Sequence, residues 1–129
     1  MLIALLLAFV ALGVTKAQAI VVVDGRPVGI TFGQTARVTA ANTGTRAITI
    51  SGTFLDSEGA VLGQFESQVI EPGKMMSFDL NADAIVREGE RIQIRIVISA
   101  DTLRGLLRST EVFENATGKT TVFAIDPGN

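Results

Sequence analysis

The stretch Arg91–Ala100, RIQIRIVISA, decides the fold. Its isoleucines take every second position and are Ile92, Ile94, Ile96 and Ile98. In the first half, the positions between them are polar and are occupied by Arg91, Gln93 and Arg95. Successive side chains of a β-strand point to opposite faces, so this alternation predicts a strand with one buried and one wet face. Strands of this kind are typical of antiparallel sheets.

Similar short runs precede and follow this stretch, separated by Gly, Pro, Asp and Asn. We expect further strands at 20–23, 27–32, 35–41, 46–55, 60–70, 76–80 and 120–125. Ile48, Ile50 and Phe54 should face the core. Gly52, among them, should mark a bulge or a point of close packing. Asp24-Gly25 is a turn pair typical of a hairpin.

About seven to nine short strands without a long helix predict an all-β chain, an immunoglobulin-like antiparallel β-sandwich over residues 20–129. A small closed barrel is the alternative. Residues 106–114 fit either a strand or, at their start, one helical turn around Gly105. The chain has no Cys and no Trp, so the disulfide and the buried Trp of antibody domains are absent. The expectation therefore concerns the architecture alone.

The N-terminus reads LIALLLAFVALGV at residues 2–14, thirteen apolar residues in a row, followed by Ala17-Gln18-Ala19. The run fits a secretory signal segment with a peptidase site, and it falls short of the roughly 20 residues that span a bilayer. We therefore expect residues 1–19 to be a signal peptide, and the protein to be secreted or to work in the periplasm or cell envelope. The alternative is an uncleaved segment that tethers the protein to the membrane. It would place Lys16 within the apolar span. A charged side chain at the middle of the bilayer raises the free energy of membrane insertion by about 2.5–3.5 kcal/mol.

Cleavage would leave 110 of the 129 residues, the size of one domain. Residues 1–19 hold one charged side chain, Lys16, so ten of the 11 basic and all 13 acidic side chains remain, a net charge of −3. No basic tract is present, so we expect no binding of nucleic acid and no membrane insertion after cleavage. Without Cys, the fold must rest on its apolar core.

The residue types that the chain lacks limit the reactions that it can catalyse. The chain has no His and no Cys, which excludes imidazole bases, the usual zinc, copper and iron ligand sets, and Ser–His or Cys–His nucleophile pairs. It also has no Trp and no Tyr, the amphipathic aromatic platforms on which sugars stack. We therefore expect no enzymatic activity and no cofactor. A His-free carboxylate hydrolase is the remote alternative.

Several stretches of the chain look familiar when taken together. They are FGQTARVTAAN at 32–42, FLDSEGAVL at 54–62, EPGK at 71–74 with FDL at 78–80, and TEVFENATGKT at 110–120. In this order they resemble uncharacterised, exported bacterial proteins with a β-sandwich of immunoglobulin or fibronectin-III type. The resemblance spans most of residues 30–125 and consists of turn and strand signatures. It implies this fold and brings no catalytic or ligand residues. Phe32 departs from it, since such proteins often place Pro before the Gly.

The best candidate for a recognition site is the stretch 103–108. In a sandwich it would lie near a loop between late strands, where such folds often carry binding residues. An apolar patch with a cationic rim, suited to a protein partner, would be formed by Leu103, Arg104, Leu106, Leu107 and Arg108. The alternative, which we favour, is that the leucines cover an open end of the core.

Two further motifs have plain structural explanations. Asp56 and Glu58 offer carboxylates to a calcium ion, but an EF-hand loop needs three more ligands at fixed spacing, so we favour a hairpin turn with Gly59. Asn115-Ala116-Thr117 matches the glycosylation sequon. We expect it to form a turn in which Gly118 takes the left-handed conformation.

These observations favour a non-catalytic, exported β-sandwich module that acts through protein contact, in adhesion, envelope assembly or as a scaffold. Edge strands of such a module can pair with a strand of another chain. A small-ligand or glycan-binding domain is the alternative.

Overall fold

The computed structural model describes residues 20–125, which form nine strands and one short 3₁₀ helix. The elements are β1 (Val21–Asp24), β2 (Val28–Thr31), β3 (Gln34–Asn42), β4 (Ile48–Asp56), β5 (Val61–Ile70), β6 (Met75–Asn81), η1 (Ala82–Ala84), β7 (Arg91–Ala100), β8 (Leu106–Glu114) and β9 (Thr120–Ile125). The expected signal peptide at 1–19 lies outside the described residues.

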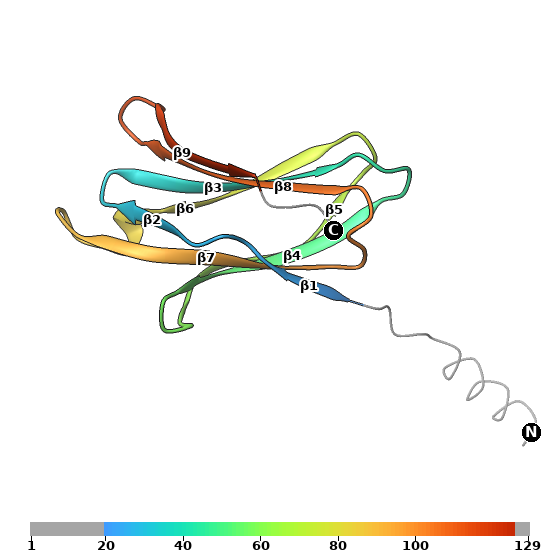
Figure 1. Ribbon diagram of the computed structural model, residues 1–129, viewed down its shortest axis with the longest axis horizontal. Coiled ribbons are helices and arrows are strands. Elements are labelled where there is room, and N and C mark those ends of the chain that lie inside the picture. Colours follow the sequence, from blue (N-terminus) through green and yellow to red (C-terminus); the bar gives the residue numbers. More distant parts are fainter. Residues whose placement is uncertain (1–19, 126–129) are drawn as a thin grey trace, which may run out of the picture.

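The strands form two antiparallel sheets that lie one over the other (Figure 1). One sheet has the order β1-β7-β4-β5, with β2 also paired to β7, and the other has the order β6-β3-β8-β9. The predicted all-β sandwich is therefore confirmed in its class and layers. The closed barrel is wrong, because the described strands divide into two separate sheets.

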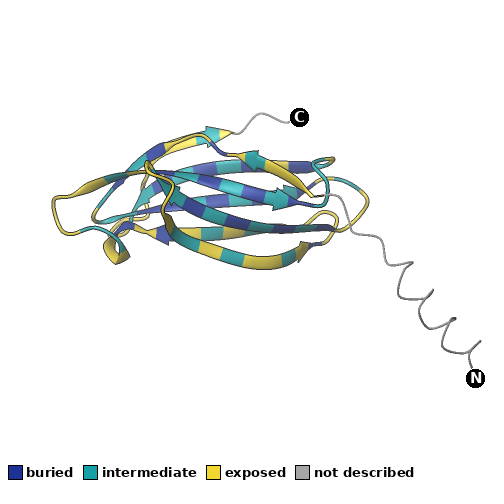
Figure 2. Cartoon of the chain, turned by 90° about the horizontal axis from the view of Figure 1, so that it is seen from below, coloured by how far each residue is buried: buried dark blue, intermediate teal, exposed yellow. Residues whose placement is uncertain are grey.

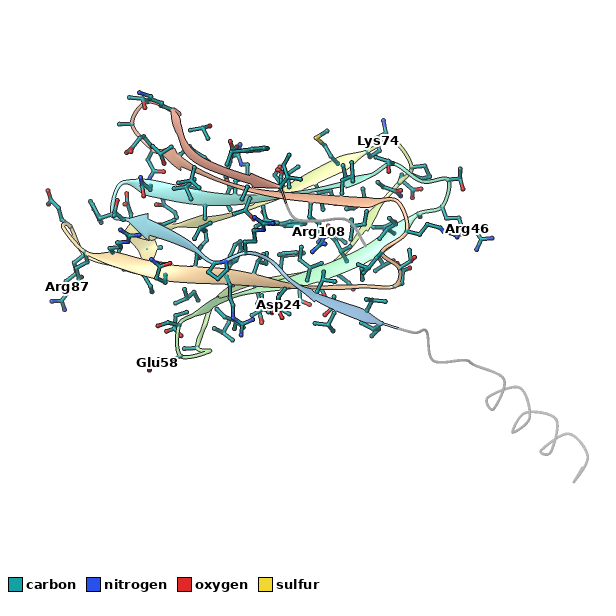
Figure 3. The ribbon with its side chains drawn as sticks, viewed as in Figure 1. Asp24, Arg46, Glu58, Lys74, Arg87 and Arg108 are labelled. Atoms are coloured by element: carbon teal, nitrogen blue, oxygen red, sulfur yellow. The ribbon has the colours of Figure 1, made fainter. Side chains whose placement is uncertain are left out.

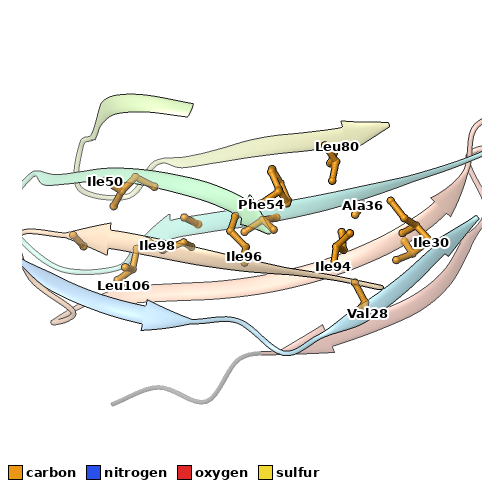
Figure 4. Packing of buried hydrophobic residues seen from close by; sticks show 14 of the residues in the cluster. Val28, Ile30, Ala36, Ile50, Phe54, Leu80, Ile94, Ile96, Ile98 and Leu106 are labelled. Carbon is orange, nitrogen blue, oxygen red and sulfur yellow. The ribbon is translucent and has the colours of Figure 1, made fainter. Parts of the chain in front are cut away.

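The alternating side chains meet between the sheets. Ile94, Ile96 and Ile98 of β7 are at most 3% exposed, as the sequence predicts. They belong to one apolar cluster with side chains of the facing sheet, Leu106 among them (Figure 4). Along most strands, buried and more exposed residues alternate (Figure 2). Burying one aliphatic side chain stabilises a fold by about 1.5–3 kcal/mol, so a cluster of this kind can hold a domain without disulfides.

The hairpin predicted at Asp24-Gly25 is wrong, since β1 and β2 do not pair with each other. Both pair with β7, β1 along its second half and β2 along its first. The N–H of Gly25 donates to the carbonyl oxygen of Ile96 at 2.7 Å, so the chain continues along β7. The long strand offers hydrogen-bond partners to both pieces, and this outweighs the local turn preference.

Residues 106–114, for which helix and strand are both open from the sequence, form β8. This strand pairs with β3 along its whole length, and its inward side chains keep a period of two. The chain bends just before it, at Gly105, whose φ is +80°. The helical turn is wrong because a strand here gives β3 a second partner and buries Leu106 and Val112.

Gly52 is a point of close packing, as predicted. The pairing of β4 with β5 shifts in register next to it. A Cβ on Gly52 would overlap the ring of Phe65. That ring stacks on Phe78 of the other sheet, with centroids 3.5 Å apart and planes 5° from parallel. The absent side chain thus makes room for an aromatic pair that closes the β5–β6 side of the sandwich.

We expect Gly52→Ala to lower the free energy of unfolding by about 1–3 kcal/mol, because the Phe65 ring must leave its stack. Urea unfolding measures this change. In a Phe65→Ala background the same substitution should cost clearly less, since the overlapping ring is gone. Equal costs in the two backgrounds would contradict the steric explanation.

Candidate interaction surfaces

The buried side chain of Asn42, which is 1% exposed, lies at one end of the sandwich. Its Nδ2 donates to the carbonyl oxygens of Arg46 at 2.7 Å and Ile70 at 2.8 Å. Its Oδ1 accepts from the N–H of Gly44 at 2.9 Å. A buried amide is tolerated only when its hydrogen-bonding capacity is used. Asn42 meets that condition and ties the β3–β4 turn to the end of β5.

The main chain of Asn42 bonds the turn between β5 and β6. Its N–H donates to the carbonyl oxygen of Lys74 at 2.9 Å, and its carbonyl oxygen accepts from the N–H of Gly73 at 2.8 Å. One residue therefore fixes this end of β3 to both neighbouring turns through its main chain and side chain together.

The β7–β8 loop packs directly on the β3–β4 turn. The carbonyl oxygen of Gly105 accepts from the N–H of Thr43 at 2.8 Å and from its hydroxyl at 3.0 Å. A Cβ on Gly105 would stand 2.8 Å from the main-chain nitrogen of Gly44. The close approach and the positive φ both require glycine at this position. The two loops are thus held together as one frame.

The structure separates the five residues expected to form a recognition patch. Leu106 and Arg108 are 5% and 6% exposed and point inward from β8, whereas Leu107 is 56% exposed and points outward. Leu103 is half-buried against the core, and Arg104 is exposed in the loop. Because neighbouring strand residues face opposite ways, no single surface presents the three leucines. Leu103 and Leu106 cover the end of the core, as in the alternative that we favour.

Arg104 instead lines a surface depression between the two loops. The other residues that line it are Gly44, Thr45, Arg46, Ala47, Asp101 and Thr102. Oδ1 of Asp101 accepts from the N–H of Thr49 at 3.1 Å, which fixes the β7–β8 loop to β4. Arg46 is the residue that sequence reasoning missed. Arg46 and Arg104 are far apart in the chain, and only the pairing of the strands brings them to one depression.

A second exposed surface is formed by β9 and the adjoining outer side of β8. Val122, Phe123 and Ile125 are 42%, 60% and 67% exposed. Ile125 lies opposite Ser109 and Phe123 opposite Glu111, so Phe123 and Ile125 share the outer face with Leu107. The strand TTVFAI has no charged side chain, and within residues 20–125 no strand lies beyond it. An exposed, apolar, uncharged edge is a template for pairing with another strand.

A fixed cation borders this apolar surface. Arg37 on β3 donates from Nε to Oδ1 of Asp79 at 2.8 Å and from Nη2 to Oδ2 at 2.9 Å. Its guanidinium carbon lies 4.9 Å from the ring centre of Phe113 on β8. The hydrogen bond to Asp79, together with the charge of that group, raises the pKa of Arg37. The position of the guanidinium is set by side chains of two neighbouring strands, β6 and β8.

At the opposite end, Asp56 and Glu58 lie in the hairpin turn that we predict for them. Oδ1 of Asp56 accepts from the N–H of Glu58 at 2.9 Å and of Ala60 at 2.8 Å. Gly59 has a φ of +81°, which completes the turn. In the part of the chain that the structure describes, no cluster of three or more acidic side chains is arranged to hold a metal ion.

Asn115, the first residue of the sequon, is a structural residue of this same end. Its Oδ1 accepts from the hydroxyl of Thr35 at 2.5 Å, and its Nδ2 donates to Oδ1 of Asn81 at 3.0 Å. Gly118 has a φ of +72°, so the predicted turn with a left-handed glycine is confirmed.

No family model and no curated protein matches this sequence. Across residues 20–125 there is no helix with the length and apolar character needed to cross a bilayer.

We expect Asn42→Ala to lower the free energy of unfolding by about 2–4 kcal/mol, because three main-chain groups lose their partner at a buried position. The matched change at the opposite end, Asn115→Ala, should cost less, since water can reach the groups that it leaves. Urea unfolding of the two variants compares them. If Asn115→Ala lowers the free energy of unfolding as much as Asn42→Ala does, burial is not the reason for the cost at Asn42.

Proposed function

We propose that this protein is an exported, non-catalytic β-sandwich module that acts by contact with other proteins, in adhesion, envelope assembly or as a scaffold. The observation that carries the proposal is the edge strand β9, whose apolar side chains are exposed and uncharged. Proteins usually protect a strand edge with charge, proline or a bulge that twists it away. An edge without charged residues is suited to pairing with a strand of a partner.

The immunoglobulin-like type is part of this proposal and is supported by the central strand pairs. In immunoglobulin domains, strand B pairs with E and strand C with F. Here β3 pairs with β6 and β4 with β7, in separate sheets, as B–E and C–F do. The ends of the chain differ: β8 lies beside β3, in the place of strand A, and β1 and β2 lie beside β7, in the place of strand G. We therefore propose a variant whose terminal strands have exchanged sheets.

Strand addition at β9 would use two kinds of interaction. The free N–H and C=O groups of the edge would bond the main chain of the incoming strand and supply affinity. Phe123, Ile125 and Leu107, on one face, would contact its side chains and supply selectivity. The edge of β5, by comparison, also exposes Val61 and Val69 but interrupts them with exposed Glu66 and Gln64, so it is less suited to an apolar partner than β9.

The residue types support the non-catalytic part of the proposal. The sequence offers no imidazole and no thiol, so a hydrolytic mechanism would depend on carboxylates alone. Three of these carboxylates are engaged as turn or pairing groups: Asp56 with its own turn, Asp79 with Arg37, and Asp101 with β4.

Because the chain has no Cys, one introduced cysteine can place a photocrosslinker at a single position. We expect Phe123→Cys, labelled with benzophenone maleimide and returned to the native envelope fraction, to crosslink a discrete partner. The matched probe on β5, an edge strand of the other sheet, is Gln64→Cys and should give none. A Phe123→Lys competitor should fail to suppress the adduct, whereas the unlabelled wild-type protein should suppress it. Crosslinking from position 64 alone would contradict the assignment to β9.

Export predicts a processed N-terminus. After expression with its own leader in a bacterium, the protein recovered outside the cytoplasm should begin at Ile20 on N-terminal sequencing. A sequence that begins at Met1 in a membrane fraction would favour the uncleaved tether instead. Replacing Ala17 and Ala19 by Leu, a matched change at the expected site, should block processing.

A further inference from the structure

The depression at the loop end brings together two arginines from different loops. Arg46 lines it from the β3–β4 turn and Arg104 from the β7–β8 loop. Arg46 projects at this end of the sandwich together with Lys74, whereas Arg87 lies at the opposite end (Figure 3). The cations of this depression are therefore separated by the length of the sandwich from the charged loop that contains Glu88 and Glu90.

These two arginines differ from the two surface arginines that are held in ion pairs. Arg37 is in an ion pair with Asp79, and Arg95 with Asp24. Among the described residues, neither Arg46 nor Arg104 has an ion-pair partner. Asp101 is the one carboxylate among the lining residues, and one of its oxygens is engaged by the N–H of Thr49. The depression therefore carries an excess of positive charge on a chain whose net charge is −2.

The frame that carries the two arginines is already fixed. The hydrogen bonds of Asn42 set the β3–β4 turn, and the contact of Gly105 with Thr43 and Gly44 sets the β7–β8 loop against it. The N–H of Arg104 donates to the hydroxyl oxygen of Thr102 at 3.1 Å, which leaves the hydroxyl hydrogen available to a ligand. A ligand would thus meet positioned main chains and would not have to order the loops at its own cost.

We propose that this depression binds carboxylate groups of an acidic protein segment. A guanidinium presents a planar fork of donors that matches a carboxylate in two parallel hydrogen bonds. Two guanidiniums on separate loops suit two carboxylates of one segment, with the threonine hydroxyls as further donors. This site lies apart from the β9 edge, so it goes beyond the proposed function and is tested separately from it.

The test uses residues 20–129 of the protein and a fluorescein-labelled peptide of six glutamates, with fluorescence anisotropy at low salt. We expect saturable binding that weakens as salt is added. Arg46→Ala combined with Arg104→Ala should raise the Kd by about tenfold or more, because both forks are lost. Arg87→Ala, the matched exposed arginine at the opposite end, should leave the Kd within about twofold. Arg46→Lys combined with Arg104→Lys keeps both positive charges and should give an intermediate Kd, because an ammonium lacks the planar fork.

Each control separates the proposal from a simpler explanation. Absence of saturable binding by the wild-type protein would overturn it, as would an equal effect of Arg87→Ala or equal binding of a six-glutamine peptide. Displacement of the peptide by inorganic phosphate at a lower concentration than by acetate would overturn the assignment to carboxylates. Far-ultraviolet circular dichroism verifies that the variants fold. If the double variant does not fold, the Kd of the single variant Arg104→Ala is measured in its place. Phe123→Lys should leave peptide binding unchanged, so failure at β9 is distinguishable from failure here.

Discussion

Asn42 places an amide at the end of an apolar core, in a position where water cannot replace a missing partner. Its side chain and main chain together bond the turns on either side of β3, and through Gly44 they support the contact with the β7–β8 loop. Hydrophobic burial is non-directional and would tolerate many arrangements of these loops. The amide is directional, so it selects one of them. The geometry of the depression with Arg46 and Arg104 depends on that selection.

The sequence predicts the parts of the fold that a period of two determines. The isoleucines of β7, the inward set of β4 and the close-packing role of Gly52 follow from local pattern and lie as expected. The pattern fails where distant strands compete with local preference. Asp24-Gly25 has the composition of a hairpin turn, but β7 is long enough to pair with the chain on both sides of it.

The recognition stretch shows the same limit for function. The spacing of the leucines suggests one patch at 103–108, whereas the strand register sends Leu106 and Leu107 to opposite faces. Arg104 and Arg46 line one depression only because β7 pairs with β4 and β8 pairs with β3, which brings the loops at their ends together. No spacing within either loop encodes this arrangement. A site of this kind therefore cannot be predicted from the sequence until the order of the strands is known.

The two long sides of the sandwich are closed by different means, and this difference bears on where a partner strand can act. At the β5–β6 side, Phe65 and Phe78 stack between the sheets. At the β8–β9 side, the inner face of β8 carries Arg108 and Thr110 among its apolar residues, and the buried hydroxyl of Thr110 has no hydrogen-bond partner. Burial of a polar group stabilises a fold less than burial of an apolar group. The β8–β9 side therefore contributes less to the free energy of unfolding than the β5–β6 side. Local opening begins where the fewest apolar contacts must be broken, which favours β9 over β5 as the edge that accommodates an incoming strand.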